Sequence, residues 1–163
     1  MLDAPMIDPY ELRDAFGCLP TGVTVVSMLD EAGKPTGVTV GSVTSLSMSP
    51  ALCLFSLGKQ QASARLFKEG APFVVNVLST DLTDLAWQFA KPLEDKCEGV
   101  ELTESLVQAP RLKDAIAHFA CHAHAIYDGG DHIIVVGEIL DFDHKEGDAL
   151  IFYRGQMQTS APL

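Results

Sequence analysis

A stretch rich in hydroxyl side chains, residues 39–50, is the first segment whose composition suggests chemistry. Short hydroxyls and exposed backbone N–H groups can hold a phosphate or hydrogen-bond a flat heterocycle without carrying charge. Ser and Thr are also common where strands end in loops, so a ligand-free strand end is the alternative interpretation. The stretch runs in order through Thr39, Val40, Gly41, Ser42, Val43, Thr44, Ser45, Leu46, Ser47, Met48, Ser49 and Pro50.

A second segment, residues 59–65, combines a helix start with two cations. Ser63 is placed to cap a short helix over residues 63–69, and a helix N-terminus attracts anions. Lys59 and Arg65 add positive charge beside it. The alternative is a capped helix whose cations are simply solvated. Gln60, Gln61, Ala62 and Ala64 complete the segment.

A third segment is the turn Gly129, Gly130, Asp131 and His132. A histidine at the start of a strand, beside a carboxylate and a flexible turn, can orient or protonate a small ligand. A solvent-exposed hairpin turn with no ligand is the alternative.

Three histidines, His118, His122 and His124, fall at alternating positions of one predicted strand and so on one face. A metal site would need a further convergent ligand and an outer shell of partners, so we expect a solvated polar face and no metal. Sequence motifs of hydrolases, zinc proteases, P-loop proteins and Rossmann dinucleotide-binding folds are missing from the chain.

The composition fits one globular domain over residues 1–163, with 47% hydrophobic and 20% charged residues. Eleven Lys and Arg stand against 22 Asp and Glu, which gives a net charge of -11. Such a surface repels nucleic acids and anionic lipids, so neither is expected as a partner. A site for an anionic cofactor would therefore need local donors.

The four cysteines contain no Cys-x-x-Cys pair, and Cys53 and Cys121 lie in apolar runs where buried thiols are expected. The acidic, proline-containing residues 1–10 do not have the pattern of a signal peptide. No apolar run approaches the roughly 18 residues that span a bilayer. A cytoplasmic location is therefore expected.

Hydrophobic periodicity predicts a mainly β protein with short helices. Strands are expected over residues 22–29, 37–43, 51–57, 73–78, 115–127, 132–141 and 149–153, and helices over residues 8–17, 63–69 and 81–90. Turn residues at 30–35 join the first two strands in a hairpin, and residues 94–110 are expected to cross the surface irregularly. These short connections indicate a closed or nearly closed antiparallel barrel, since closure removes exposed edges.

Taken in order, the segments resemble the short-chain flavin reductase family, whose members are split-barrel flavin-binding proteins that supply two-component monooxygenases. The resemblance extends from Leu12 to Tyr153, and the shared order of weak motifs makes it specific. The motifs are residues 13–17 (RDAFG), 20–26 (PTGVTVV), 37–47 followed by Pro50, 73–78 (FVVNVL), 85–90, Asp95 with Lys96, 130–132 (GDH) and 137–139 (GEI).

The resemblance implies an antiparallel, Greek-key-like split barrel that forms homodimers and binds FMN or FAD near the subunit boundary. It places the flavin ring at the hydroxyl stretch, the flavin phosphate near residues 61–63 and the nicotinamide beside His132. The implied cofactor-binding residues are Thr39, Val40, Gly41, Ser42, Thr44, Ser45, Ser47, Lys59, Gln61, Ala62, Ser63 and Asp131, with His132 as the catalytic residue.

The implied activity is NAD(P)H:flavin oxidoreductase, with NADH or NADPH as hydride donor and a monooxygenase as partner. The hydride passes between the cofactors, so the protein need only stack and hold the two rings. A non-catalytic flavin-binding protein of the same fold is the main alternative. A ligand-free barrel and a haem or pyridoxine-phosphate protein on a related barrel are the others.

Three positions depart from the family pattern and bear on flavin choice and affinity. Gly41 stands where Asn is frequent, which removes a side-chain contact. Cys97 stands where Phe usually follows the Asp-Lys pair. The last segment, residues 154–157, lacks a frequent aromatic residue.

Overall fold

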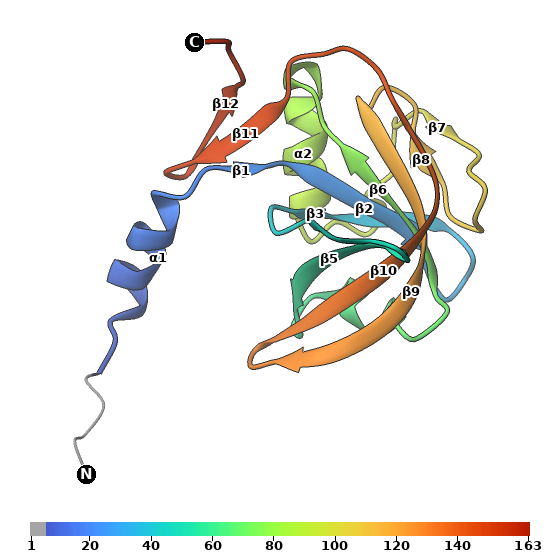
Figure 1. Ribbon diagram of the computed structural model, residues 1–163, viewed down its shortest axis with the longest axis horizontal. Helices are drawn as coiled ribbons and strands as arrows, with labels where there is room; N and C mark the ends of the chain where they lie inside the picture. The colour runs from blue at the N-terminus through green and yellow to red at the C-terminus, as the bar shows by residue number, and fades with distance from the viewer. Residues whose placement is uncertain (1–5) are drawn as a thin grey trace.

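The computed structural model describes residues 6–163 and has a long, curled antiparallel sheet at its centre (Figure 1). Its seven strands follow the order β3-β2-β6-β9-β10-β5-β4. They are β2 (Thr24–Leu29), β3 (Pro35–Val40), β4 (Thr44–Met48), β5 (Ala51–Gly58), β6 (Pro72–Val77), β9 (Ala117–Gly129) and β10 (His132–His144). The curl brings β3 against β5, which gives the nearly closed barrel that the strand pattern predicted.

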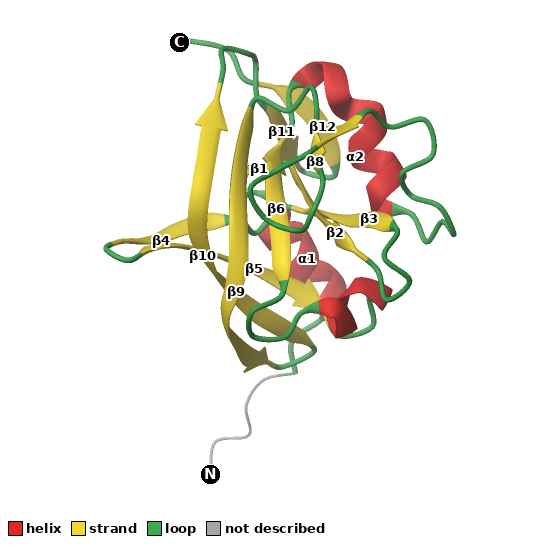
Figure 2. Cartoon of the chain, turned by 90° about the vertical axis from the view of Figure 1, so that its right-hand side faces the viewer, coloured by secondary structure: helices red, strands yellow, loops and turns green. Residues whose placement is uncertain are grey.

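Smaller elements surround this sheet. A second sheet contains β1 (Thr21–Gly22), β11 (Leu150–Tyr153) and β12 (Gln156–Thr159), and a third pairs β7 (Leu102–Thr103) with β8 (Arg111–Leu112). The helices are α1 (Pro9–Gly17), η1 (Ala62–Leu66), η2 (Thr80–Leu82) and α2 (Thr83–Ala90). Helix α1 projects away from the barrel beside β1 and β11 (Figure 1), whereas α2 covers the barrel near β2 and β3 (Figure 2). Within residues 6–163, no helix has the length and apolarity that crossing a membrane requires.

Three phenylalanines fix the interior of the barrel. Phe55, Phe67 and Phe73 meet edge to face, with ring centroids 5.4–5.6 Å apart. Such pairs add stability beyond the area that they bury. Gly137 of β10 lies against this cluster, because a Cβ atom there would be 2.5 Å from Cζ of Phe73. The core therefore couples β5, β6 and β10 through close packing.

The expectation of two buried thiols is confirmed. Cys53 and Cys121 are both buried, and their sulfur atoms lie 3.9 Å apart beside the phenylalanine cluster. The prediction for residues 1–10 concerns a segment that lies partly outside the described residues, which begin at Met6.

The predicted β hairpin, the helix from Pro9 and the buried strands are confirmed, but several boundaries were wrong. The second strand ends at Val40 instead of residue 43, because the chain turns at Gly41 and Ser42. The later part of the hydroxyl stretch, to which no strand was assigned, forms β4, which pairs with β5. Strand β12 was not expected, although it completes a hairpin with β11.

The capping role predicted for Ser63 is wrong. The segment forms the 3₁₀ helix η1, which begins at Ala62 after Gln61, and no side chain caps it. Ser63 is buried inside the helix instead. The helix ends at Leu66 because Phe67 turns into the aromatic cluster of the core.

His118 lies on the same face of β9 as His122, but the expectation that it is solvated is wrong. It is buried, with Nδ1 2.6 Å from Oδ1 of Asp143 and Nε2 2.6 Å from the Leu112 carbonyl oxygen. The ladder between β6 and β9 runs without a shift from Ala117 to His122, so His118 keeps the period of two and is buried because the segment that ends at Leu112 covers this part of the face. The polar face is therefore shorter than expected.

Candidate functional site

Ser42 lies at the seam of the barrel, in the link between β3 and β4. Its Oγ accepts a hydrogen bond from the Ser56 N–H at 2.9 Å and donates one to the Ser56 carbonyl oxygen at 3.1 Å. Since β3 and β4 are the two ends of the sheet, these bonds fasten the link to β5. Gly41 lies close to β1, because a Cβ atom there would be 3.0 Å from Oγ1 of Thr21. The backbone of the link is thus held in place by contacts on both sides.

Three hydroxyls of β4 remain available to a ligand. Thr44 and Ser45 are exposed and Ser47 is half-buried. Among the described residues, the Ser45 and Ser47 hydroxyls have no hydrogen-bond partner, and the Thr44 hydroxyl makes only a long 3.5 Å contact with the neighbouring carbonyl. Neutral donors and acceptors of this kind suit the edge of a flat heterocycle.

Thr39 and Val40 are already engaged in the fold. The Thr39 hydroxyl donates to the carbonyl oxygen of Ala86 in α2 at 2.6 Å. The Val40 side chain belongs to the core, and its carbonyl oxygen accepts a 2.7 Å hydrogen bond from Thr24. These two residues anchor the start of the hydroxyl stretch, while its free hydroxyls lie further along.

The turn between β5 and η1 contains exposed residues beside Lys59, whose charge is balanced by a carboxylate. Gln61 and Ala62 are exposed, and the Gln61 N–H donates to the Gly58 carbonyl oxygen at 2.9 Å. Lys59 Nζ lies 2.6 Å from Oδ2 of Asp128. The hydrogen bond from Lys59 lowers the pKa of Asp128, so Lys59 already has a negative partner.

His132 stands at the start of β10, opposite Gly58 of β5. Its Nδ1 lies 2.6 Å from Oδ1 of Asp131, and this contact lowers the pKa of that carboxyl group. A Cβ atom on Gly58 would be 3.8 Å from His132 Nε2, so the small residue leaves the ring uncrowded. The Lys59 N–H donates to the Asp131 carbonyl oxygen at 2.9 Å, which ties the two turns together.

Strand β5 connects the predicted segments. Ser42 bonds to Ser56, and two residues further along β5 Gly58 faces His132 and contacts the turn with Gln61. Strand β4 pairs with the other edge of β5, so the residues that carry its hydroxyls lie along the same strand. The structure therefore brings the three segments together as one candidate site, whereas the side chains of Thr39, Val40 and Ser63 are directed into the fold.

The sequence interpretation did not single out Ser56 or Gly58. Ser56 lies in the run of residues 51–57, which was predicted only as a strand, and Gly58 follows that run directly. Cys53, Phe55 and Leu57 are in fact buried, while the alternate positions are half-exposed. The single Ser and Gly at those alternate positions were the available signal.

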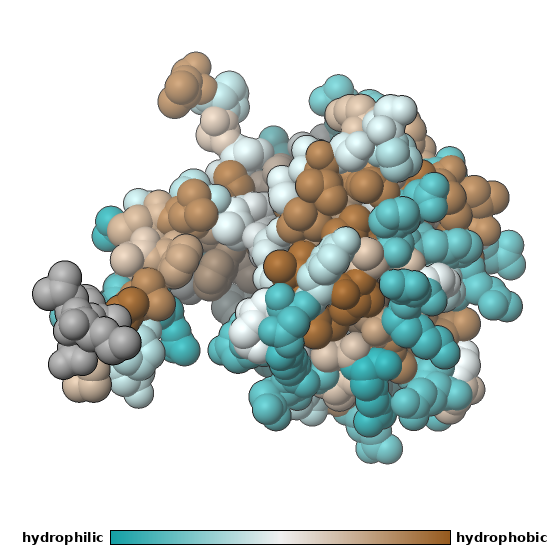
Figure 3. All heavy atoms as spheres, turned by 60° about the horizontal axis from the view of Figure 1, so that its bottom comes forward, coloured by the Kyte–Doolittle hydropathy of each residue, from teal (hydrophilic) through white to brown (hydrophobic). Residues whose placement is uncertain are grey.

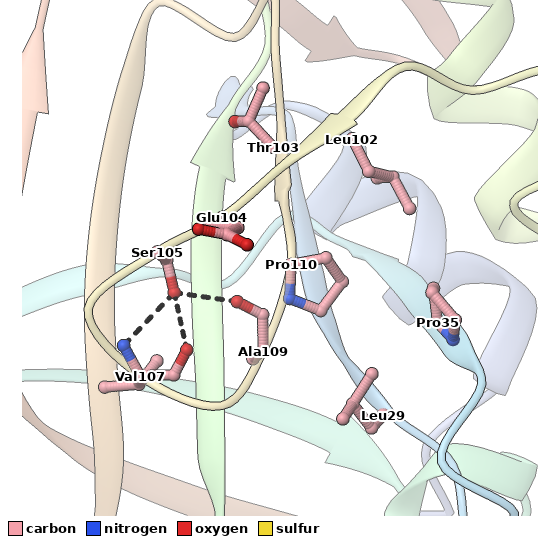
Figure 4. A pocket seen from close by; sticks show the side chains of 9 residues that line it. All are labelled: Leu29, Pro35, Leu102, Thr103, Glu104, Ser105, Val107, Ala109 and Pro110. Carbon is pink, nitrogen blue, oxygen red and sulfur yellow. Dashed lines mark hydrogen bonds between the residues drawn. The ribbon is translucent and has the colours of Figure 1, made fainter.

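A separate cavity of about 540 Å³ lies between the β2–β3 hairpin and residues 102–110 (Figure 4). Ser105 stabilises its wall, because Oγ lies 2.7 Å from the Ala109 carbonyl oxygen and 2.9 Å from that of Val107 and donates its single proton to one of them at a time. Its lining contains none of the predicted site residues, so we do not assign the candidate site to it.

Metal ligands do not assemble in the described part of the chain. No group of three His, Cys, Asp or Glu side chains in residues 6–163 is arranged to hold a metal ion.

Comparison with known proteins gives the family. A family model described as "Flavin reductase like domain" matches residues 16–161. The chain belongs to the flavin reductase-like family. The resemblance seen in the sequence is thereby confirmed.

Relatives and solved structures agree with this assignment. The chain is 38% identical over 154 residues to "Probable flavin reductase" of Rhizobium meliloti, covering 94% of this chain and 50% of that protein. It is 36% identical over 150 residues to "Flavin reductase" of Pseudomonas putida, covering 91% and 88%. A structure of the Streptomyces globisporus NADH:FAD oxidoreductase in complex with NAD and FAD fragments superposes with a TM-score of 0.87 at 34% identity over 98% of both chains. The chain spans about half the length of the first relative, and the fold is the split barrel of this family.

The hydroxyl stretch of this flavin reductase-like domain fits a flat, uncharged ring system. The free hydroxyls of Thr44, Ser45 and Ser47 supply donors and acceptors, and no carboxylate occurs within residues 39–50. The residues present could therefore hold a flavin ring by hydrogen bonds, with the exposed backbone at Gln61 and Ala62 near its phosphate.

The Asp-Lys-Cys segment of the domain is held against α2. Lys96 Nζ donates to the Phe89 carbonyl oxygen at 3.0 Å, and the Cys97 N–H donates to the Asp95 carboxylate at 2.9 Å. Burial, reinforced by the nearby Asp95, raises the pKa of the Cys97 thiol to about 11. Cys97 therefore acts as a packing residue where the family usually has Phe.

Proposed function

We propose that this chain is an NAD(P)H-dependent flavin reductase that reduces FMN or FAD. The observation that carries the proposal is the position of β5, which pairs with β4 on one edge and with β10, the strand that begins at His132, on the other. Relatives whose names describe flavin reductases and NADH:FAD oxidoreductases support the same reaction.

In this proposal the chain's own residues hold and orient the rings. Thr44, Ser45 and Ser47 bind the polar edge of the flavin, and the link at Gly41 and Ser42 supports it through backbone groups. The bound cofactors supply hydride transfer from nicotinamide to flavin. The protein contributes proximity and alignment, which are worth several kcal/mol of a bimolecular barrier.

His132 borders the nicotinamide in this arrangement. An ionised carboxylate can only accept a hydrogen bond, so the contact with Asp131 places a proton on Nδ1 of the ring. Nε2 is then left to face a ligand above Gly58. His132 is 47% exposed in its side chain, so a ligand can reach it.

We further propose that two copies of the chain form a homodimer and that the second copy helps to complete the site. Large apolar side chains are exposed on the edge strand β4 and on β10, which lies on the other side of β5, and exposed apolar surface supports an interface. The residues are Leu46, Met48, Leu140 and Phe142, with Met48 89% exposed. Helix α1 has no buried residue, which also favours a covering partner.

The product of this reaction is a reduced flavin, which a second enzyme uses as its substrate. Relatives include reductase components of flavin-dependent monooxygenases, among them one from Acinetobacter baylyi at 36% identity. We propose that a monooxygenase component accepts reduced flavin from this chain.

One assay tests the proposal. The purified protein is mixed with NADH or NADPH and with FMN, FAD or riboflavin, and nicotinamide oxidation is followed by absorbance. The expected result is flavin-dependent oxidation with saturation in both substrates. Flavin binding without oxidation would instead indicate a non-catalytic flavin-binding protein, and an absence of both would leave a barrel without this function.

A further inference from the structure

A groove runs along the turn that joins β2 to β3, outside the candidate site described above. It combines the cavity of about 540 Å³ with a second cavity of about 710 Å³, because Pro35 and Leu102 line both. One wall is the β2–β3 hairpin and the other is formed by residues 93–110. Figure 4 shows the part of this hairpin groove that residues 102–110 border.

The lining of the hairpin groove contains apolar side chains that are partly open to solvent. Six of them line the first cavity (Figure 4), namely Leu29, Pro35, Leu102, Val107, Ala109 and Pro110. Leu93 lines the second cavity and is 45% exposed, and Leu106, which follows the lining residue Ser105, is 68% exposed. Large apolar side chains left open around a cavity are typical of sites where another molecule binds.

The rim of the hairpin groove is acidic. Its charged lining residues are one lysine, Lys34, and five carboxylates, Asp30, Glu94, Asp95, Glu98 and Glu104. Asp30 and Asp95 accept hydrogen bonds from backbone N–H groups of their own loops. The three glutamates are exposed and make no side-chain hydrogen bond or ion pair within the part of the chain that the structure describes. Their charges are therefore available to the cations of a partner.

Both walls of the groove are fixed by hydrogen bonds of the chain itself. Oδ1 of Asp30 accepts hydrogen bonds from the N–H groups of Ala32 and Lys34 at 2.9 and 2.8 Å, which holds the hairpin turn. On the opposite wall, β7 pairs with β8 and the Ser105 hydroxyl holds the loop of residues 105–109. A groove that is already formed loses little conformational entropy on binding, so its contacts can contribute to affinity.

The hairpin groove lies away from the surface that we assigned to the second copy of the chain. That surface includes α1, where apolar side chains gather (Figure 3). Figure 1 shows β7 and β8 on the opposite side of the barrel from α1, and Figure 2 shows β4 and the β2–β3 hairpin at opposite sides. Strand β3 runs from Pro35 at the groove to Val40 near the seam, about 17 Å away at roughly 3.3 Å per residue.

We propose that the hairpin groove docks a partner protein through a segment that combines Lys or Arg with large apolar side chains. The apolar side chains of that segment occupy the two cavities, and its cations pair with Glu94, Glu98 and Glu104. This charge complementarity favours a basic segment over a second copy of this chain, which has only 11 Lys and Arg against 22 Asp and Glu.

The identity of the partner rests on the proposed function. A monooxygenase that accepts reduced flavin needs to come close to the reductase without covering the site from which the flavin leaves. The groove meets this condition, because the length of β3 separates it from the seam at Ser42. We therefore assign the docked segment to the monooxygenase component.

Fluorescence anisotropy tests the groove in the full chain, with a short synthetic peptide of lysine and leucine at amphipathic helical spacing as the probe. The Kd of this peptide should rise roughly fivefold in a Glu94→Gln, Glu98→Gln double variant, because two ion pairs on the rim are lost. Leu93→Ser should also weaken binding, because an apolar contact is lost. The control is a Glu146→Gln, Asp148→Asn double variant, which removes the same charge from a different acidic cavity and should leave the Kd unchanged.

Carbodiimide cross-linking and mass spectrometry locate the bound peptide. Cross-links from its lysines to Glu94, Glu98 or Glu104 are expected, and a peptide with glutamate in place of lysine should not bind. An absence of binding, an equal loss of affinity in the two double variants, or equal binding of the acidic peptide would overturn the proposal. A groove variant with a different oligomeric mass in ultracentrifugation would place a second copy in the groove and would also overturn it.

The docking site and the proposed function can fail separately. NADH oxidation with free flavin should be equal in the wild type and the groove variants, and peptide binding by a protein that oxidises no NADH would sustain the groove while the proposed function failed. In a coupled assay with a monooxygenase that forms product with this reductase at limiting flavin, the basic peptide should lower product formation without slowing NADH oxidation. Unchanged product formation would overturn the assignment of the monooxygenase as the docked partner.

Discussion

The Nδ1 atom of His132 lies 2.6 Å from Oδ1 of Asp131, its neighbour in the chain. The Asp131 carbonyl oxygen in turn accepts a hydrogen bond from the Lys59 N–H across the two turns. The imidazole is therefore oriented by one residue whose backbone is itself fixed to β5. This arrangement allows the remaining ring nitrogen to meet a substrate in a defined direction.

Replacing His132 with Ala should lower the turnover of NADH with free flavin by roughly tenfold or more, a loss of about 1.4 kcal/mol of transition-state stabilisation. The control is His124→Ala, since His124 is an exposed histidine of β9 outside the candidate site. Steady-state kinetics of both variants check the prediction. Equal turnover in the wild type and the His132 variant would remove this residue from the reaction.

Some hydroxyls of residues 39–50 already have a hydrogen-bond partner in the fold and others do not, and substitutions in these two groups should have different effects. Ser45→Ala should weaken flavin binding roughly fivefold or more while the unfolding free energy stays the same, because only a ligand can use that hydroxyl. Thr39→Val should lower the unfolding free energy by about 1 kcal/mol, since the Ala86 carbonyl loses its donor, with little effect on flavin affinity.

Flavin fluorescence titration and urea denaturation of the two variants make this comparison. If the Thr39 variant lost flavin affinity and the Ser45 variant did not, the assignment of the free hydroxyls would be wrong.

Asp143 should make the fold sensitive to acid. Its contact with His118, assisted by Arg111, lowers the pKa of the Asp143 carboxyl group below its ordinary value of 3.8. The stabilisation is therefore complete above that ordinary value and is lost as the pH falls through the lower pKa of the folded state. Asp143→Asn should be less stable than the wild type at neutral pH and lose less stability on acidification.

Urea unfolding at a series of pH values measures this dependence. The control is Asp141→Asn, an exposed carboxylate of β10 with no hydrogen bond or ion pair in the described chain. Parallel curves for the wild type and the Asp143 variant would show that the contact contributes nothing.

Gly137→Ala should destabilise the barrel by about 1–3 kcal/mol, because the new methyl group must displace the Phe73 ring from the aromatic cluster. Gly22→Ala is the control, since a Cβ atom there would meet nothing within 4 Å. Thermal unfolding of both variants provides the measurement. An unchanged midpoint for the Gly137 variant would mean that the core can rearrange around the methyl group.

The sequence predicted the parts of this fold that follow from local chemistry. The Pro9 start of α1, the hairpin of β2 and β3, and the apolar core strands each have a pattern within a few residues. Strand β4 could not be recognised in this way, because only Thr44 of its five residues belongs to the types enriched in strands, and the segment forms a strand by pairing with β5. Ser63 was likewise predicted as a helix cap from the local preference of Ser for that position. The burial of Phe67 in the core places Ser63 inside the helix instead.

The candidate site was predictable as segments and not as an arrangement. The hydroxyls, the turn before η1 and the Gly-Asp-His turn were each visible in the sequence. Their assembly depends on Ser56 and Gly58, whose roles arise from register between β5, β10 and the seam at Ser42. The left-handed backbone of Arg154 and its hydrogen bond to Gly17 at the end of α1 could not be predicted from the sequence, because both depend on the tertiary structure.

The central claim is that neutral hydroxyls and backbone groups around β5 hold a flavin in an acidic protein. Titration of FMN and FAD into the purified chain, followed by quenching of flavin fluorescence, tests this claim most directly. We predict saturable quenching by the wild type and clearly weaker binding by a Ser45→Ala, Ser47→Ala double variant. Flavin fluorescence that stays unchanged at every protein concentration, at low and moderate salt, would contradict it.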